Sequence, residues 1–150
     1  MGANARDKGQ RGEREIADML NLIVSEVRSS KGYPPFETRD GLFQRNQNQT
    51  AVGGSDLSNP LSLEIEVKRQ EQLSINAWWK QTLESAARTD GIPILIFKQK
   101  YKPWRVVMLG SIPLQPASAS SYRTMEGVRV ELSVDDFKTW FRTYYSRFLA

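Results

Sequence analysis

The chain of 150 residues contains no cysteine and no histidine. The absence of cysteine excludes disulfide bonds, thiol nucleophiles and cysteine-based zinc sites. The absence of histidine excludes Ser-His-Asp triads, His–metal sites and any histidine general base. Acid–base chemistry in this protein must therefore depend on carboxylates, lysines, hydroxyl groups and water.

Long apolar runs are missing as well. No run reaches the roughly 18 residues that a transmembrane helix needs, so we expect no membrane partner. The polar start, Met-Gly-Ala-Asn-Ala-Arg-Asp-Lys, lacks the apolar segment of a secretory signal. Together with the lack of cysteine, this predicts a cytoplasmic protein. Hydrophobic residues make up 39% of the chain, which is enough for one packed domain spanning residues 1–150.

The charge is weakly positive. Lysine and arginine number 21 against 17 acidic residues, which gives a net charge of +4. A basic domain suits a polyanionic partner such as nucleic acid. The same charge is ordinary for the solubility of a small domain, so it supports a nucleic-acid partner without identifying one.

The most informative stretch runs from Gly53 to Arg69, and its second half predicts a β-strand. Side chains alternate between the two faces of a strand. One predicted face is apolar and consists of Leu61, Leu63, Ile65 and Val67; the other carries Glu64, Glu66 and Lys68. Asp56 lies just upstream, after a Gly-Gly pair. An acid followed by Glu-x-Lys on one strand face is typical of a divalent-metal nuclease.

The chemistry explains why these residue types belong together. A bound Mg²⁺ can activate water, neutralise a phosphodiester and assist its leaving oxygen, and it prefers oxygen ligands. Asp56 and Glu66 are the candidate ligands, with the carbonyl of Val67 as a third. Lys68 lies on the same face as Glu66, about 6.6 Å further along the strand. From there its ammonium group can orient the water or stabilise developing charge. Glu64 lies one pleat further from Lys68 and is the weaker candidate.

A structural interpretation of the same residues remains open. The polar face can be the solvated side of an amphipathic strand, with Glu66 and Lys68 forming a weak surface pair. Asp56 can be a turn residue before Asn59-Pro60.

Two motifs together resemble a known family. Gly54-Ser55-Asp56 followed by Glu66-Val67-Lys68 resembles the PD-(D/E)XK nuclease core, with Ser55 in the place of the proline. The run from Lys8 to Glu15 is similar to the first helix of archaeal-type Holliday-junction resolvases, which begins with Lys-Gly, three residues and Glu-Arg. The resemblance covers residues 6–110. It implies an α/β fold with a central mixed sheet flanked by helices and a core of about residues 8–110.

The resemblance also implies a function. It implies a Mg²⁺-dependent endodeoxyribonuclease (Mn²⁺ substituting) that acts as a homodimer in DNA recombination and repair by resolving Holliday junctions. Glu13 would join the metal site, and Gln81 or Lys80, on the helix after the catalytic strand, would assist. By analogy, such a small enzyme suits a phage in a bacterial host. The proposed phosphate contacts are Lys8, Arg11, Arg14, Arg45, Arg69 and Lys80.

Three other functions are compatible with the same residues. One is another PD-(D/E)XK endonuclease, either restriction-like or a repair enzyme, acting on duplex, nicked or flapped DNA. The second is a DNA-binding module of the same fold without hydrolysis. The third is an interaction domain that docks through an aromatic C-terminal helix.

Periodicity predicts the remaining elements. A helix is expected over about 10–29 after a frayed start, and a second over 75–89, capped by Ser74 and ended by Gly91. Its inward residues would be Ile75, Trp79, Leu83 and Ala86. The run 93–97 predicts a buried central strand, and 104–109 the next strand. Asp40-Gly41 predicts a hairpin over 36–45.

The C-terminal third is predicted to add an extra strand and a helix over about 128–149. Residues 111–127 lack periodicity and are expected to form a loop, with a short strand over 128–132. Ser133 starts a capping motif. The following helix carries the aromatic stripe Phe137, Trp140, Phe141, Tyr144, Tyr145 and Phe148. This stripe predicts either core packing or a dimer interface.

Overall fold

The computed structural model describes residues 2–36, 41–46, 55–121 and 123–149, with the side chains of residues 2–5 excepted. The elements in these residues are α1 (Gly2–Ser30), β1 (Gln44–Arg45), β2 (Leu57–Ser58), β3 (Leu63–Arg69), α3 (Ile75–Thr89), β4 (Ile92–Lys98), β5 (Arg105–Pro113), β6 (Thr124–Ser133) and α4 (Val134–Leu149). None of these helices has the length and hydrophobicity that a membrane span requires.

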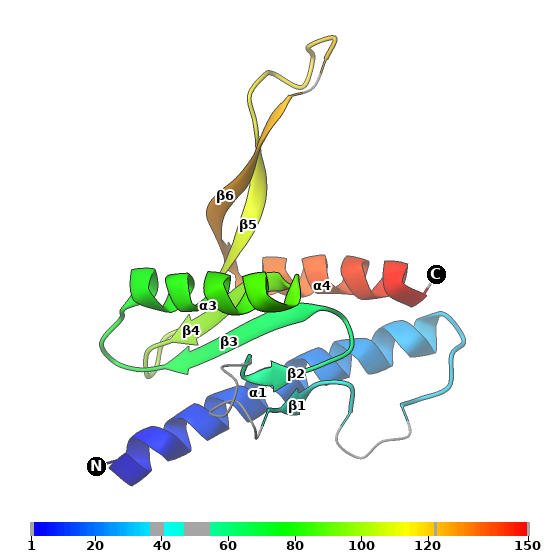
Figure 1. Cartoon of the computed structure of the whole chain (residues 1–150). Helices are drawn as coiled ribbons and strands as arrows, with labels where there is room; N and C mark the ends of the chain where they lie inside the picture. The colour runs from blue at the N-terminus through cyan, green and yellow to red at the C-terminus, as the bar shows by residue number, and fades with distance from the viewer. Residues whose placement is uncertain (1, 37–40, 47–54, 122, 150) are drawn as a thin grey trace.

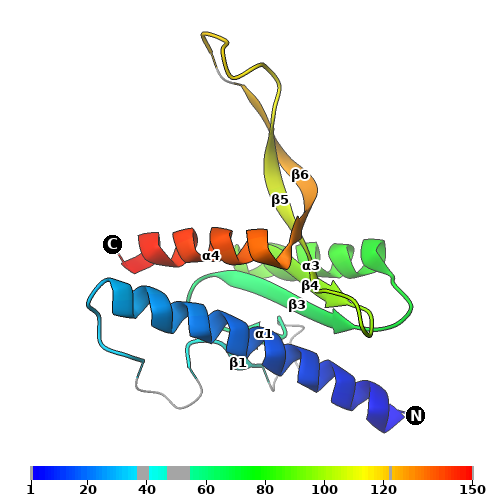
Figure 2. The same cartoon turned by 180° about the vertical axis from the view of Figure 1, so that it is seen from behind.

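A four-stranded mixed sheet organises the fold. Its strand order is β3-β4-β5-β6, with β3 and β4 parallel and the other pairs antiparallel. Helix α3 lies on one face, and α1 and α4 lie on the other (Figures 1 and 2). The short pair β1-β2 lies beside β3, the edge strand. The predicted α/β architecture, a mixed sheet flanked by helices with an added C-terminal strand and helix, is confirmed.

Helix α1 begins at Gly2, so the expectation of a frayed segment before residue 10 is wrong. The first proline of the chain is Pro34, so no residue before it prevents helical hydrogen bonding. The helix buries one face, formed by Ile16, Leu20, Ile23, Val24 and Val27, against the sheet. Gly12 permits a close approach, because a Cβ there would lie 3.3 Å from Cη2 of Trp104.

The strands divide the core between the two faces of the sheet. Leu63, Ile65 and Val67 of β3 are buried on the side of α1 and α4. On the other side, a smaller cluster under α3 is formed by Trp78, Trp79, Leu95, Phe97 and Val107. Strand β4 contributes to both clusters, which confirms the prediction of a buried central strand.

Helix α3 spans the predicted residues, but some details differ. Leu83 is 37% exposed, whereas Trp78, Thr82 and Ser85 are buried, so the predicted inward face is partly wrong. The paired tryptophans determine the orientation because they bury the largest apolar surface. Ser74 is the N-cap but its side chain makes no capping hydrogen bond. Asp90, not Gly91, takes the left-handed conformation at the C-terminus, with φ of 54°.

Residues 111–127 are not simply a loop, which corrects the prediction. Strand β5 runs to Pro113 and β6 starts at Thr124, and together they form an arm that projects from the body (Figures 1 and 2). The register shifts between Gly110 and Ile112, where Gly127 adopts φ of 70° on the partner strand. The outer part of the arm, residues 109–113 and 124–127, is mostly exposed, so no alternation of burial is imposed on its sequence.

Helix α4 begins as predicted, because the N–H of Asp136 donates to Oγ of Ser133 at 3.1 Å. Phe137, Phe141 and Tyr145 are buried in the main core, so core packing explains most of the aromatic stripe. Phe148 is 58% exposed.

The predicted hairpin over 36–45 falls partly outside the described residues. Asp40, at its turn, is one of the undescribed positions. The described part shows that Gln44 and Arg45 pair antiparallel with Ser58 and Leu57 of β2.

Candidate active site

Asp56 lies against the outer edge of β3. Its backbone N–H donates to the carbonyl of Ile65 at 2.9 Å, and its Oδ2 accepts from the N–H of Val67 at 2.7 Å. Because the N–H and C=O of one strand residue point to the same side, the carbonyl of Val67 also points toward this edge. The structure therefore brings together the carboxylate of Asp56 and the backbone group predicted to assist it.

Glu66 is buried next to Asp56, with 3% of its surface exposed against 7% for Asp56. The alternative interpretation, in which Glu66 lies on a solvated face of the strand, is therefore wrong. Burial, followed by the charge of Asp56, raises the pKa of Glu66 to about 8. Burial also raises the pKa of Asp56 to about 6, although the hydrogen bond from Val67 opposes this. Because both pKa values are raised, the pair as a whole retains about one proton near neutral pH.

Lys68 and Glu13 act on the same pair electrostatically. The positive charge of Lys68 lowers the pKa of both carboxyl groups, and the negative charge of Glu13 raises the pKa of Asp56. The structure thus assembles Glu13 from α1 with Asp56, Glu66 and Lys68 around the edge of β3. Glu13 and Lys68 are 55 positions apart in the sequence, because β1 and β2 lie between α1 and β3 along the chain.

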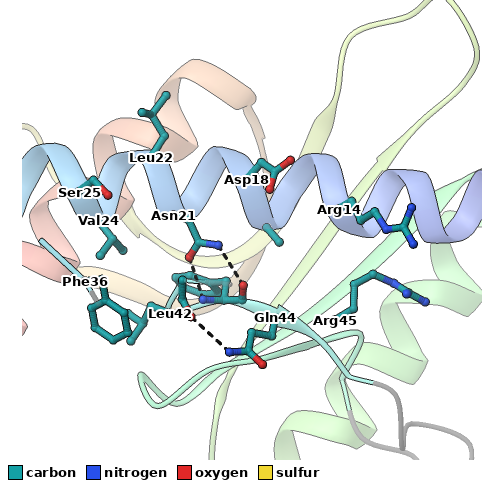
Figure 3. A pocket seen from close by; sticks show the side chains of 13 residues that line it. Arg14, Asp18, Asn21, Leu22, Val24, Ser25, Phe36, Leu42, Gln44 and Arg45 are labelled. Atoms are coloured by element: carbon teal, nitrogen blue, oxygen red, sulfur yellow. Dashed lines mark hydrogen bonds between the residues drawn. The ribbon is translucent and has the colours of Figure 1, made fainter. Parts of the chain in front are cut away.

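Glu13 already has a partner. The Nε of Arg45, on β1, lies 2.8 Å from Oε2 of Glu13, and both side chains are mostly buried. Arg45, one of the predicted phosphate contacts, forms this ion pair in the structure. Figure 3 shows Arg45 and Arg14 at the same end of a pocket of about 640 Å³ between α1 and residues 41–45.

Asn21 attaches that segment to α1. Its Nδ2 donates to the carbonyl of Phe43 at 3.0 Å, and its Oδ1 accepts from the N–H of Phe43 at 2.8 Å (Figure 3). Phe43 is buried in the main core. The strand that carries Arg45 is therefore held in place by α1, the helix that carries Glu13.

Helix α3 covers the face of the sheet that carries Glu64 and Glu66. Oγ1 of Thr89 donates to Oε1 of Glu64 at 2.7 Å, and the charge of Glu64 contributes a smaller part of the rise in the pKa of Glu66. Ser85 and Gln81 precede Thr89 by one and two turns on the same stripe of the helix. Gln81 is exposed at the margin of the α3 face that carries Ser85, whereas Lys80, also exposed, is rotated away from Gln81 by about 100°.

The other predicted phosphate contacts have different environments. Arg69 is largely buried, and its Nη1 lies 3.8 Å from Oε1 of Glu15 and makes no hydrogen bond. Arg11, Arg14 and Lys80 are exposed, and Lys8 is partly exposed. Arg11, Arg14 and Lys8 lie on the half of α1 that also carries Glu13.

Sequence reasoning missed two residues that hold Asp56. Asn46 donates its N–H to the carbonyl of Asp56 at 2.9 Å and its Nδ2 to the carbonyl of Ser55 at 3.0 Å. The hydroxyl of Ser55 donates to the carbonyl of Leu57 at 3.1 Å. Asn46 begins the run Asn-Gln-Asn-Gln, and nothing in that composition marks the residue that holds Asp56.

The donor set fits a hard divalent cation. In the described residues, no three acidic side chains are assembled as a ready-made metal site. Two carboxylates, a carbonyl and water oxygens are nevertheless the ligands that Mg²⁺ takes in proteins. The raised pKa values of Asp56 and Glu66 reflect burial and mutual repulsion that a cation would relieve. Asp56, Glu66 and Val67 are thus suited to hold such an ion, with Glu13 beside them.

No curated protein sequence matches the chain. Among solved structures, the chain is similar to Hjc, a Holliday junction resolvase from the hyperthermophilic archaeon Archaeoglobus fulgidus, at 17% identity and a TM-score of 0.46, over 88% of this chain and 96% of the other. Residues 4–148 match the model of the family described as "Phage putative PDDEXK endonuclease". The chain therefore belongs to this family of PD-(D/E)XK nucleases.

Proposed function

We propose that the protein is a Mg²⁺-dependent endonuclease, with Mn²⁺ able to substitute, that cleaves branched DNA such as a four-way junction. The observation that carries this proposal is the buried pair of Asp56 and Glu66 beside Lys68, with Asp56 bonded to the backbone N–H of Val67. Two buried acids that share a proton are costly in a purely structural strand, which favours a catalytic role over a binding module without hydrolysis.

Each residue has a distinct task in this proposal. Asp56, Glu66 and the carbonyl of Val67 would hold the metal, which supplies an activated water and neutralises the phosphodiester. Lys68 would orient the attacking water and stabilise the charge that develops on the phosphoryl oxygens. Glu13 would complete the site after separating from Arg45. Gln81, on α3, would position the water.

The DNA backbone would follow the N-terminal half of α1, where Lys8, Arg11 and Arg14 lie on the helix that carries Glu13. Binding through phosphates releases counterions, so affinity should fall steeply with salt. An affinity that does not change with salt would contradict this path.

We further propose that the protein acts as a homodimer, because a four-way junction presents two symmetry-related strands. The β5-β6 arm supports this, since Ile112, Leu114 and Met125 are exposed on it and an isolated two-stranded ribbon is marginally stable in water. Replacing Ile112 and Met125 by glutamate should give monomers in sedimentation. A wild-type protein that sediments as a monomer at all concentrations would exclude the dimer.

Cleavage of a labelled four-way junction with Mg²⁺ tests the function. It is run beside linear duplex, flapped and single-stranded DNA. We expect paired, symmetric nicks in the junction, and their loss in Asp56→Ala. Glu64→Gln is the matched control, because Glu64 lies on the same face of β3 but is bonded to Thr89.

The outcomes separate the alternatives. Cutting only of flapped, nicked or linear DNA would keep the endonuclease and reject junction resolution. Binding without any cutting would identify a DNA-binding module. Equal loss of cutting in Glu64→Gln and Asp56→Ala would contradict the assignment of the site.

A further inference from the structure

The turn between β4 and β5 has an unusual conformation and an unusual residue at its tip. The N–H of Lys102 donates to the carbonyl of Gln99 at 3.1 Å and closes the turn. Tyr101, at its third position, has φ of 63°, a left-handed conformation normally taken there by glycine or asparagine. Its side chain is 89% exposed, more than any other large hydrophobic side chain among the described residues. The turn therefore presents an aromatic ring to solvent at a cost in backbone strain.

The turn is held in a fixed position. The backbone carbonyl of Glu71 accepts from Nε2 of Gln99 at 2.7 Å, and the carboxylate of Glu71 accepts from the N–H of Lys100 at 3.0 Å. Just after the turn, Nε1 of Trp104 donates to Oε2 of Glu15 on α1 at 2.8 Å. Tyr101 is thus displayed by an anchored turn, which reduces the entropy lost when its ring meets a ligand.

Three lysines lie close to Tyr101 in the sequence. Lys98, Lys100 and Lys102 alternate within five residues, and none of the ion pairs between described residues includes them. The Nζ of Lys100 lies 5.0 Å from the centre of the Tyr101 ring, and the Nζ of Lys98 lies 5.4 Å from that of Trp104. An aromatic ring surrounded by positive charge suits a polyanion with flat bases better than an apolar protein surface.

The turn is adjacent to the candidate active site. Lys68 and Arg69 of β3 are in register with Phe97 and Lys98 of β4, so the turn extends from the strand ends just beyond Lys68. Both views show the turn at the end of the sheet nearest the N-terminal half of α1 (Figures 1 and 2). At about 3.3 Å per residue, the chain from Phe97 to Gln99 extends the strand by about 6.6 Å before it turns to Tyr101. This distance corresponds to about two nucleotides of a strand.

We infer that the β4-β5 turn is a DNA-binding surface in which Lys98, Lys100 and Lys102 contact phosphates and Tyr101 stacks on an unpaired base near the cleaved bond. This inference rests on the proposed function and adds that the protein recognises an unpaired base in its DNA substrate. In an intact duplex the base faces are covered by their neighbours. A protruding ring can stack only where a base is uncovered, as at a gap or a branch point.

The test measures binding separately from cleavage. Fluorescence anisotropy in EDTA compares a labelled duplex that contains a two-nucleotide single-stranded gap with the same duplex without a gap. Tyr101→Asn removes the ring and keeps a residue that tolerates the left-handed backbone. We expect it to weaken binding to gapped DNA about tenfold and to leave binding to intact duplex within about twofold. Tyr101→Phe keeps the ring and should bind as wild type.

The lysines are tested by salt dependence. Lys100→Gln combined with Lys102→Gln should weaken binding to both DNAs and reduce the slope of log affinity against log salt by about 2. The matched control, Lys138→Gln combined with Arg147→Gln on α4, removes the same charge elsewhere and should leave affinity nearly unchanged.

The outcomes distinguish this inference from the proposed function. Wild-type cleavage with unchanged binding in Tyr101→Asn and in the double lysine variant overturns the inference alone. Equal loss of gapped and intact DNA in Tyr101→Asn rejects the stacking role. A wild-type protein that neither binds nor cuts DNA overturns both.

Discussion

Arg45 neutralises Glu13 across 32 positions of sequence, with its Nε 2.8 Å from Oε2 of the glutamate. The side chains are only 22% and 11% exposed, so the pair is more strongly coupled than a surface salt bridge. Since Glu13 also acts electrostatically on Asp56, Arg45 provides positive charge beside the acids in the place where a metal would provide it.

We predict that Arg45→Gln tightens Mn²⁺ binding several-fold. The variant leaves Glu13 uncompensated next to Asp56, so a divalent cation gains more by binding. Titration calorimetry on the metal-free protein measures this. Arg14→Gln is the control, because Arg14 follows Glu13 on α1 and is exposed, and this variant should bind Mn²⁺ as wild type does. Weaker binding in Arg45→Gln would mean that Arg45 orients Glu13 for the metal and does not compete with it.

A second prediction concerns stability and pH without metal. The pKa of Glu66 is raised to about 8 in the fold, so the folded state binds this proton more tightly than the unfolded state. Its contribution to stability is fully present below the ordinary pKa near 4.5 and is lost as pH rises through 8. Glu66→Gln, which cannot ionise, should therefore gain stability relative to wild type by on the order of 5 kcal/mol at pH 9, at about 1.4 kcal/mol for each unit of the raised pKa. Thermal unfolding in EDTA measures this gain; an equal difference at pH 4 and pH 9 would refute it.

A third prediction is that metal binding releases protons. At pH 7 the shared proton of Asp56 and Glu66 must leave before both carboxylates can bind a cation. Calorimetry of Mn²⁺ binding in two buffers of different ionisation enthalpy should report about one proton released at pH 7 and less at pH 9. Glu64→Gln should release the same number as wild type, whereas Glu66→Gln should release fewer and bind the metal more weakly.

A fourth prediction compares two glycines of α1. A Cβ at Gly9 would meet nothing within 4 Å, whereas one at Gly12 would lie 3.3 Å from Trp104 and 3.5 Å from Cβ of Arg69. Gly9→Ala should stabilise the protein by up to about 1 kcal/mol through helix propensity. Gly12→Ala should gain less, because its methyl group crowds Trp104. Chemical denaturation measures both; a larger gain at Gly12 would show that Trp104 yields readily.

Much of the fold could be predicted from sequence wherever burial dictates the pattern. The alternation in β3, the apolar run of β4 and the stripe of α1 each match one face packed on the core. The strands predicted over 104–109 and 128–132 correspond to parts of β5 and β6, but the outer part of the arm was missed because residues 111–113 and 124–127 are mostly exposed, so that no burial pattern marks them. Leu83 was misplaced because two tryptophans compete for the same face of α3.

The clustering of the candidate site residues could be predicted from the sequence, but the contacts that hold them could not. Asp56, Glu66 and Lys68 follow from spacing along one segment. The ion pair of Glu13 with Arg45 and the support of Asp56 by Asn46 depend on long-range packing, which local sequence does not encode. Tyr101 was visible only as part of a turn, since its exposure and backbone conformation require the structure.

The hydrogen bonds between Asp56 and β3 have a consequence for how the protein behaves in concentrated solution. β3 is an edge strand of the sheet, and an uncovered edge is a template for the strands of other molecules. Asp56 occupies that edge by pairing its N–H with Ile65 and its carboxylate with Val67. The residue proposed for catalysis thus also shields the sheet from intermolecular strand addition, so inactivating it by Asp56→Ala is expected to increase aggregation as well as to abolish cleavage.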